Sequence, residues 1–191
     1  MTRRAGLDKV AVIEEAARLI DEEGIEQLSL GRLAERLGVR VPSLYNHVTG
    51  LPGLKRDLAI YCLRELLSRL TRVVMGKARG DAIFALANSY RDYARQTPGH
   101  YAFTLSAPDS DDKEWQELGR QNVEIFIAIL APYKLSEEEA IHAIRSLRSI
   151  VQGFVSLEIT GGFAMSVDLD ASFHWLVRLY VEGLEQLAGS L

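Results

Sequence analysis

The chain has 191 residues, of which 48% are hydrophobic and 25% are charged, and its formal net charge at pH 7 is −4. This apolar content supports a sizeable core and excludes an intrinsically disordered chain. The single cysteine, Cys62, excludes an internal disulfide framework, and no apolar run suits a signal peptide or a membrane span, so we expect a cytoplasmic protein without a membrane partner.

Three short helices are expected at the start of the chain. The first has an N-cap at Asp8 and ends at Gly24, and its apolar residues lie three or four positions apart: Val10, Ile13, Ala17 and Ile20. Ser29 is the expected N-cap of a second helix that ends at Gly38. Pro42 suits the first turn of a very short third helix. This order is the sequence pattern of a helix-turn-helix.

Longer helices are expected in the rest of the chain. Their predicted ranges are from Gly53 to a break at 75–81, 82–96 ended by the segment TPGH, 115–130, 136–160, and from Asp170 or Ser172 to the C-terminus. A polar loop that includes Asp109 is expected at 106–113, and Ser136 with Glu139 predicts a capping box. Because no stretch alternates with a period of two, we predict an all-α fold.

The short corner at residues 29–48 suits DNA in shape and in local charge. A helix fits the major groove, and the residues at its N-terminus reach base edges. Between residues 29 and 56 the only acidic residue is Glu35, against five basic residues: Arg32, Arg36, Arg40, Lys55 and Arg56. Phosphate neutralisation supplies much of DNA affinity. Many helical corners contain Gly, Pro and a few basic residues, so spacing alone places DNA binding only slightly ahead of a purely structural corner.

Residues 8–62 resemble the N-terminal domain of the TetR family of transcriptional regulators. The matching run reads AARLIDEEGIEQLSLGRLAERLGVRVPSLYNHV. The resemblance implies a three-helix DNA-binding domain, which we place at residues 1–54, joined by a long helix to a ligand-binding and dimerisation domain at 55–191. It also implies a homodimeric repressor that binds a pseudo-palindromic operator in double-stranded DNA. The main alternative is a helical small-molecule-binding or interaction protein without operator function.

The resemblance also assigns DNA-binding residues. Tyr45 and His47 match the family's phosphate-contacting pair at a recognition helix near 41–47, although Tyr45 could pack and His47 would also suit the helix dipole. This chain has Leu51 where many relatives have a phosphate-contacting Lys, so we expect Lys55 and Arg56 to replace it. The full expected set is Ser29, Arg40, Val41, Pro42, Ser43, Tyr45, Asn46, His47, Lys55 and Arg56.

The segment YRDYARQTPGHYAFT resembles a subgroup of the family whose C-terminal domain is named for a Trp-His-Gly motif. In the corresponding segment, SIVQGFVSLEITGGF, this chain keeps Gly153 but has Gln152 where His is typical. Because the family dimerises through its last two helices, the resemblance implies an interface formed by their apolar residues, which could instead form an ordinary core: Ile144, Leu147, Val151, Val155, Phe173, Leu176, Val177, Tyr180 and Leu184.

An inducer cavity is implied between the middle helices. Aromatic side chains commonly line such pockets, although core packing is the more common role of any one of them. The expected ligand-binding residues are Tyr90, Tyr93, Tyr101, Phe103, Phe126 and Phe154, with Glu158 or Gln152 as a polar anchor. Few charges lie among them, so we expect a hydrophobic small-molecule inducer. We find no catalytic set, phosphate loop or metal-ligand spacing, and so expect no enzyme, cofactor or metal.

Overall fold

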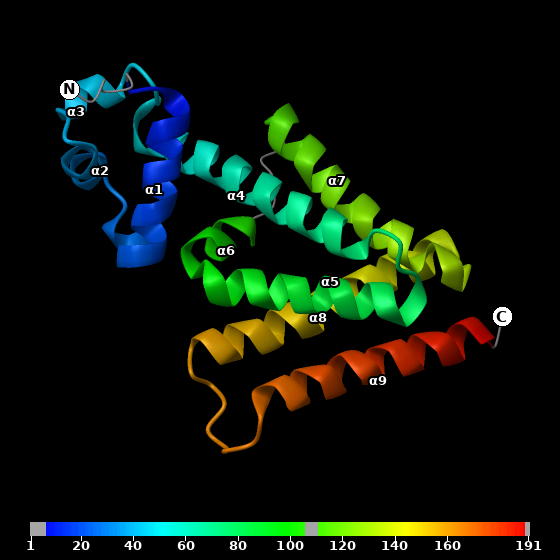
Figure 1. The fold of residues 1–191 in the computed structure, drawn as a ribbon. Coiled ribbons are helices and arrows are strands. Elements are labelled where there is room, and N and C mark those ends of the chain that lie inside the picture. Colours follow the sequence, from blue (N-terminus) through cyan, green and yellow to red (C-terminus); the bar gives the residue numbers. More distant parts are fainter. Residues whose placement is uncertain (1–6, 106–110, 190–191) are drawn as a thin grey trace. The chain divides into compact units, whose positions relative to one another are not determined.

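The computed structural model describes residues 7–105 and 111–189, and helices make up most of these residues (Figure 1). The elements are α1 (Lys9–Glu23), η1 (Ile25–Gln27), α2 (Leu30–Leu37), α3 (Val41–Leu44), α4 (Gly50–Val74), α5 (Arg79–Gln96), α6 (Pro98–Thr104), α7 (Lys113–Leu130), η2 (Ala131–Tyr133), α8 (Glu137–Ile159) and α9 (Leu169–Gly189). No β-strand occurs in the described ranges, which confirms the predicted all-α fold. Asp109 and the rest of 106–110 in the predicted polar loop lie outside these ranges.

Local capping chemistry determines where several helices begin. The side chains of Asp8 and Ser29 accept hydrogen bonds from the backbone N–H three residues later, at 2.8 and 3.1 Å. The predicted capping box is present: the Ser136 hydroxyl accepts from the Glu139 N–H at 3.3 Å, and the Ser136 N–H donates to the Glu139 carboxylate at 2.8 Å. These bonds satisfy N–H groups that have no partner within the helix.

Several predicted helix starts were displaced by a few residues, among them those of α5, which begins at Arg79 and not at 82, and α7, which begins at Lys113 and not at 115. α4 begins at Gly50 and not after Gly53, because Pro52 falls in its first turn, where the missing N–H costs nothing. α9 begins at Leu169 and not at Asp170 or Ser172. The Asp168 carboxylate accepts a hydrogen bond from the Ala171 N–H at 2.8 Å and caps the helix.

The prediction missed α6. The segment TPGH was expected only to end a helix, but its proline occupies the first turn of α6. None of the described helices combines the length and apolar character needed to cross a membrane.

The described residues form two compact units. Unit 1 contains the chain up to Glu65 together with the α6 segment from Thr97, and unit 2 contains Leu66–Gln96 and the chain from α7 onwards. Helix α4 therefore contributes residues to both units, and α6 is a segment of unit 1 that lies in sequence between two stretches of unit 2. The domain boundary after residue 54 stays a prediction.

Each unit has its own apolar core. In unit 1 the core is formed by α1, the corner and the first half of α4, and its residues include Val12, Ala16, Leu19, Ile20, Leu33, Leu44, Val48, Leu54, Leu58 and Cys62. In unit 2, α5 contacts α7, α8 and α9, and the core includes Ile83, Leu86, Phe126, Leu147, Val155, Phe173 and Val177. The corner is thus braced by longer helices, as so short a helix pair requires.

Candidate functional site

The chain turns sharply between α2 and α3. Gly38 ends α2 in the left-handed conformation, with a φ of 65°, and its N–H donates to the Glu35 carbonyl at 3.1 Å. The next N–H, of Val39, donates to the Ala34 carbonyl at 3.0 Å. These bonds satisfy the last carbonyls of α2 and redirect the chain within three residues. The geometry is that of a helix-turn-helix, with a second helix of four residues.

The outer face of this corner carries the predicted DNA-binding residues. Leu44 is fully buried and anchors α3, whereas the Tyr45 side chain that follows it is 60% exposed. All ten predicted residues are exposed or half-buried, and eight of them lie within residues 29–47. Lys55 and Arg56 lie in the second turn of α4, also in unit 1. The corner therefore presents polar and basic groups over an apolar anchor.

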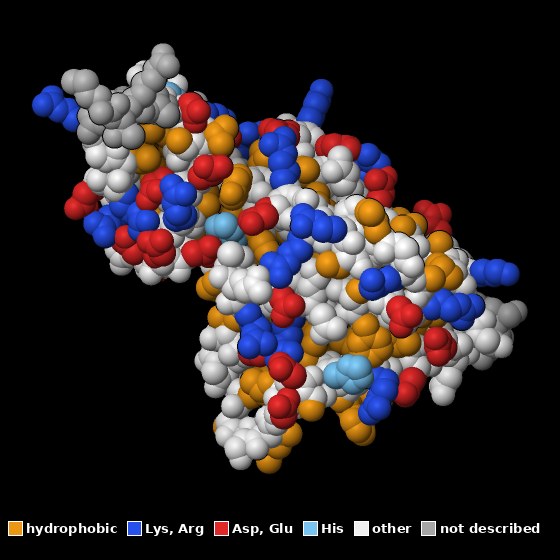
Figure 2. Space-filling view, in the orientation of Figure 1, with side chains coloured by type: hydrophobic (Ala, Val, Ile, Leu, Met, Phe, Trp, Pro, Cys, Tyr) orange, Lys and Arg blue, Asp and Glu red, His pale blue; other side chains and the backbone are white. Residues whose placement is uncertain are grey.

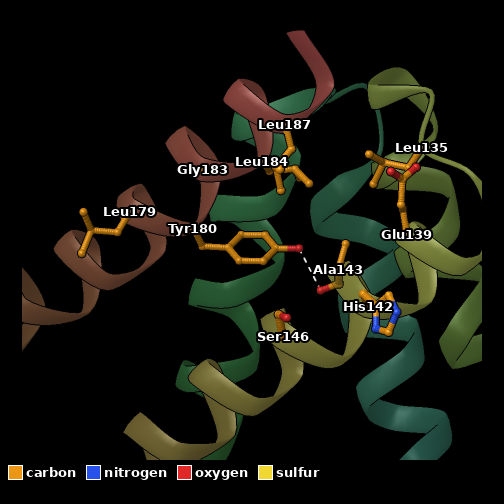
Figure 3. A pocket seen from close by; sticks show the side chains of 10 residues that line it. All are labelled: Leu135, Glu139, His142, Ala143, Ser146, Leu179, Tyr180, Gly183, Leu184 and Leu187. Atoms are coloured by element: carbon orange, nitrogen blue, oxygen red, sulfur yellow. Dashed lines mark hydrogen bonds between the residues drawn. The ribbon is translucent and has the colours of Figure 1, made fainter. Parts of the chain in front are cut away.

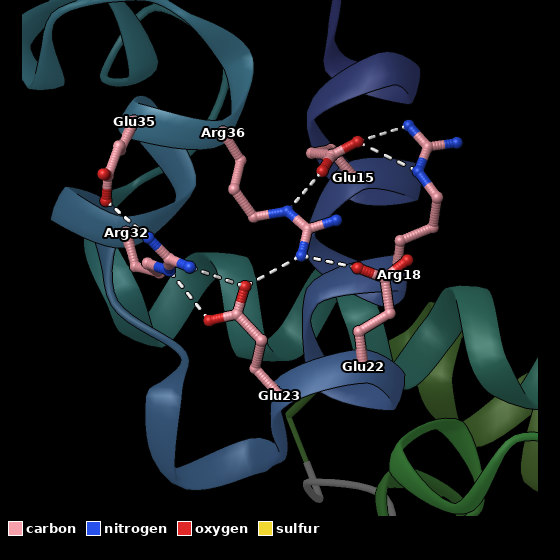
Figure 4. Close-up of polar contacts among 7 residues, drawn as sticks. All are labelled: Glu15, Arg18, Glu22, Glu23, Arg32, Glu35 and Arg36. Atoms are coloured by element: carbon pink, nitrogen blue, oxygen red, sulfur yellow. Dashed lines mark hydrogen bonds and ion pairs between the residues drawn. The ribbon is translucent and has the colours of Figure 1, made fainter.

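Two arginines in the corner are engaged in an ion-pair network with α1 (Figure 4). Arg36 contacts Glu15 at 2.6 Å, Glu22 at 2.8 Å and Glu23 at 2.9 Å. Arg32 makes a bidentate pair with Glu23, at 2.8 and 2.9 Å. Burial raises the pKa of Glu15, but hydrogen bonds from arginines outweigh it and hold that pKa below its ordinary value. Hydrogen bonds from Arg32, and then from Arg36, lower the pKa of Glu23.

This network corrects the local charge inferred from the sequence. The excess of positive charge over residues 29–56 included Arg32 and Arg36, whose charges are balanced by carboxylates from outside that window. In the view of Figure 2, blue and red side chains lie next to one another over unit 1. Arg40 and Lys55 make no ion pair within the described parts of the chain, and Arg56 donates to Asp57 at 3.2 Å.

The expected ligand-binding residues separate into groups. Tyr90 and Phe126 line a cavity of about 10 Å³ in unit 2, together with Leu86, Leu147, Arg148, Val151 and Gln152. The Gln152 amide donates to the Tyr90 hydroxyl at 3.0 Å, so one expected polar anchor does lie among them. Tyr93 and Phe154 are buried elsewhere in unit 2. Tyr101 and Phe103 are buried on α6 in unit 1.

Glu158, expected as a polar anchor, is engaged in an ion pair in this structure. Its carboxylate accepts two hydrogen bonds from the Arg91 guanidinium, at 2.8 and 2.6 Å, and the same guanidinium lies 2.8 Å from Asp170. Arg91 is 5% exposed and lies over the rings of Phe154 and Phe173. Since Glu158 lies in the last turn of α8 and Asp170 in the first turn of α9, Arg91 links the two helices on either side of their connection. Sequence spacing gave no sign of a pair 67 residues apart.

Most of the residues expected at a dimer interface are buried within the single chain. Seven of the nine expected residues are buried within a single chain: Ile144, Leu147, Val151, Val155, Phe173, Val177 and Leu184. Both helices are apolar on two faces, and periodicity could not tell the face against α5 from the open one. The exposed large apolar side chains of the same helices are Ile141, Leu157, Ile159, Trp175, Leu179 and Leu187.

A groove of about 700 Å³ opens between α8 and α9 (Figure 3). The Tyr180 side chain extends from α9 toward α8, and its hydroxyl donates to the Ala143 carbonyl at 2.8 Å. Apolar side chains dominate the walls, and the groove is lined by Leu135, Glu139, His142, Ala143, Ser146, Leu179, Tyr180, Gly183, Leu184 and Leu187. Tyr180 and Leu184, two of the expected interface residues, therefore line this groove, although Leu184 is itself buried.

Comparison with known proteins identifies similar chains for both regions. Residues 12–47 match the family model described as bacterial regulatory proteins of the tetR family, and residues 83–180 match the one described as a tetracyclin repressor-like C-terminal domain. An uncharacterized HTH-type transcriptional regulator of Mycobacterium tuberculosis is 37% identical over 97% of this chain and 85% of its own length. One from Bacillus subtilis is 33% identical over 96% of both chains. The crystal structure of a TetR variant from Acinetobacter baumannii with minocycline is 26% identical, covers 95% of this chain and 98% of that one, and has a TM-score of 0.72.

Proposed function

The chain belongs to the TetR family of bacterial transcriptional regulators, and from this premise we propose that it is a ligand-responsive repressor that binds a pseudo-palindromic operator as a homodimer. The family and the curated relatives are DNA-binding transcriptional regulators and not enzymes. The observation that carries the proposal is the helix-turn-helix corner, whose polar face is exposed above a buried Leu44. A regulator must reach the chromosome, so we place it in the cytoplasm.

DNA recognition is assigned to α3 and the residues around it. The major groove admits a helix, and the N-terminal residues of that helix reach base edges. We assign base-edge contacts to Val41, Pro42, Ser43 and Asn46. Phosphate contacts are assigned to Ser29, Arg40, Tyr45, His47, Lys55 and Arg56. Because the network on α1 engages Arg32 and Arg36, positive charge toward the phosphates comes chiefly from Arg40 and Lys55.

Dimerisation is assigned to the open face of α8 and α9. Trp175 is 58% exposed, Leu179 53% and Leu187 65%, and they recur along one side of α9. Contiguous apolar surface of this kind marks interaction sites. Two such helices and their copies form a four-helix bundle across a two-fold axis. A two-fold dimer places its recognition helices about 34–36 Å apart, or a multiple of this distance.

Ligand sensing is assigned to unit 2, around Tyr90, Phe126 and Gln152. Their cavity holds at most about one water molecule, so an inducer must enlarge it. The lining is mostly apolar, which favours a hydrophobic small molecule with one hydrogen-bonding group. The similar Acinetobacter protein was crystallised with minocycline, which supports a small-molecule site in this fold. A ligand that prefers one conformation shifts the population, and operator affinity changes by its differential binding energy. Helix α4 contributes to both units and is the natural path for this coupling.

Substitution of three exposed residues tests the DNA-binding half. Arg40→Ala, Tyr45→Ala and His47→Ala are combined, and duplex binding is measured by mobility shift while light scattering gives the mass. The proposal expects loss of binding from an intact dimer. Unchanged binding would assign the corner a structural role and favour the alternative, a helical small-molecule-binding or interaction protein without operator function.

A second substitution tests the dimer. Trp175→Glu with Leu179→Glu places two carboxylates on the open face of α9, and the mass should fall to that of one chain. Met75→Glu is the matched control, because Met75 is 68% exposed but lies outside α8 and α9. A double variant that keeps the mass of a dimer would remove α9 from the interface.

A further inference from the structure

Helix α6 is attached to α1 and α4 by a compact polar cluster within unit 1. One oxygen of Asp21 accepts the backbone N–H groups of Gly99 at 2.8 Å and His100 at 3.2 Å. The other oxygen of Asp21 lies 3.1 Å from Nε2 of the His100 ring. Nδ1 of the same ring lies 2.9 Å from Glu65. His100 is 7% exposed, so both ring nitrogens face carboxylates in a largely buried setting.

The number of available protons limits this arrangement. A neutral imidazole carries one N–H, so it donates to one carboxylate and turns a lone pair toward the other. Two hydrogen bonds, to Asp21 and to Glu65, require one further proton, either on the ring or on a carboxyl group. Without that proton a lone pair and a carboxylate oxygen would meet at about hydrogen-bond distance, which is repulsive. The closed cluster therefore holds one proton more than the same three side chains hold when they are apart, with two ionised carboxylates and a neutral histidine.

Several groups of α1 and α4 lie near this cluster. Burial raises the pKa of the Asp21 carboxyl, and the negative charge of Glu65 adds to this effect. On α4, the Tyr61 ring lies edge-on to His100 with centroids 6.0 Å apart, and burial raises the pKa of Tyr61 and of the neighbouring Cys62 thiol. Both groups are therefore neutral at physiological pH. From α1, the charge of Glu14 also raises the pKa of Tyr61, and the charge of Arg18 lowers it.

We propose that α6 is held on the DNA-binding unit by a latch that takes up a proton when it closes, formed by Asp21, Glu65 and His100. Helix α6 is joined at both ends to chain that belongs to unit 2, so a change in unit 2 that moves α6 must open these contacts. Opening releases the proton, and a lower pH therefore favours the closed latch. The regulatory meaning of the latch rests on the proposed function; its chemistry does not.

Amide hydrogen exchange in the full-length protein tests the latch directly. The Gly99 and His100 N–H groups donate to Asp21 and report its opening. Their protection is measured from about pH 5 to about pH 8, where histidine changes charge, and corrected for intrinsic exchange rates. One linked proton changes the opening equilibrium by up to about tenfold per pH unit, so protection should fall as the pH rises. The Leu33 N–H of α2 is the internal reference and should show no such slope.

The variant Glu65→Gln separates the proton from the packing. An amide at this position pairs with a neutral imidazole, so protection of the two amides should remain while its pH dependence disappears. Glu14→Gln, on the exposed part of α1, is the matched control and should keep the wild-type slope. His100→Gln should also abolish the slope. A wild-type slope of zero, an equal slope in Glu65→Gln, or the same slope at Leu33 would each overturn the latch. Duplex binding is measured in a separate experiment, so the hydrogen-exchange result can be interpreted even if the proposed function fails.

Discussion

Replacing Gly99 by alanine tests whether close packing of α6 on α1 stabilises unit 1. An ideal Cβ at this position would lie 2.6 Å from the carbonyl carbon and oxygen of Ile20 and 2.8 Å from a carboxylate oxygen of Asp21. Unbonded carbon atoms prefer about 3.5–4.0 Å, so α6 must retreat by roughly 1 Å. The opposing backbone cannot yield, because Ile20 is 1% exposed within the core.

The magnitude follows from three contributions. Overpacking of this kind costs about 1–3 kcal/mol. Retreat of α6 also weakens the hydrogen bond from the Gly99 N–H to Asp21, and a bond to a charged group contributes about 1.5–3 kcal/mol. Alanine regains about 0.5–1 kcal/mol through the lower backbone entropy of the unfolded chain. We therefore expect Gly99→Ala to lower the free energy of unfolding by about 2–5 kcal/mol.

Thermal and denaturant unfolding, followed by circular dichroism, measure this change. A loss of 1 kcal/mol lowers the Tm of a chain of this length by about 2–4 °C. Gly31→Ala is the matched control in α2 of the same unit, where the nearest atom to a new Cβ is the Ser29 hydroxyl at 4.0 Å. It should stabilise the protein by about 0.5–1 kcal/mol. If Gly99→Ala were as stable as the control, the contact between α6 and α1 would not be tight in solution.

Three further predictions concern the corner and its charges. Arg36→Met should lower the Tm and leave the salt dependence of duplex binding unchanged. Arg40→Met should leave the Tm unchanged and reduce the slope of log K against log salt by about 0.9 per lost phosphate contact. The reverse pattern would assign Arg36 to DNA. Because the folded state lowers the pKa values of Glu15 and Glu23 from 4.5, their ion pairs stabilise the protein above that pH and are lost as the pH falls through the folded values. The Tm should therefore drop below about pH 4.5, and Arg36→Met should flatten that drop in a pH series of thermal melts; parallel profiles would count against the network. Tyr45→Phe should weaken duplex binding about five- to tenfold in fluorescence anisotropy without a change in Tm, and a change in Tm alone would mean that the hydroxyl serves packing.

The sequence predicted the features that depend on local chemistry. Caps at Asp8, Ser29 and Ser136 satisfy N–H groups a few residues away, so a short window contains all the participants. The end of α2 at Gly38 could be predicted for the same reason, because the positive φ of that glycine is a local requirement.

The features it missed depend on residues brought together by folding. Arg36 was read as a free positive charge because its partner Glu15 lies 21 positions away, on another helix. Periodicity on α8 and α9 gave apolar stripes, but only packing against α5 shows which stripe is buried. Gly99 looked like a helix breaker, although its missing side chain is what lets α6 approach α1. The ligand-binding and DNA-binding residues as sets stay predictions.

Selection from genomic fragments tests the central claim most directly. The purified protein is mixed with sheared DNA of its own genome at low salt, and the bound fragments are sequenced. The account predicts a few enriched fragments that share an inverted repeat, with half-sites about one helical turn or a multiple of it apart, and no enrichment by the variant that lacks the Arg40, Tyr45 and His47 side chains. Absence of any enriched fragment, or equal enrichment by that variant, would contradict it.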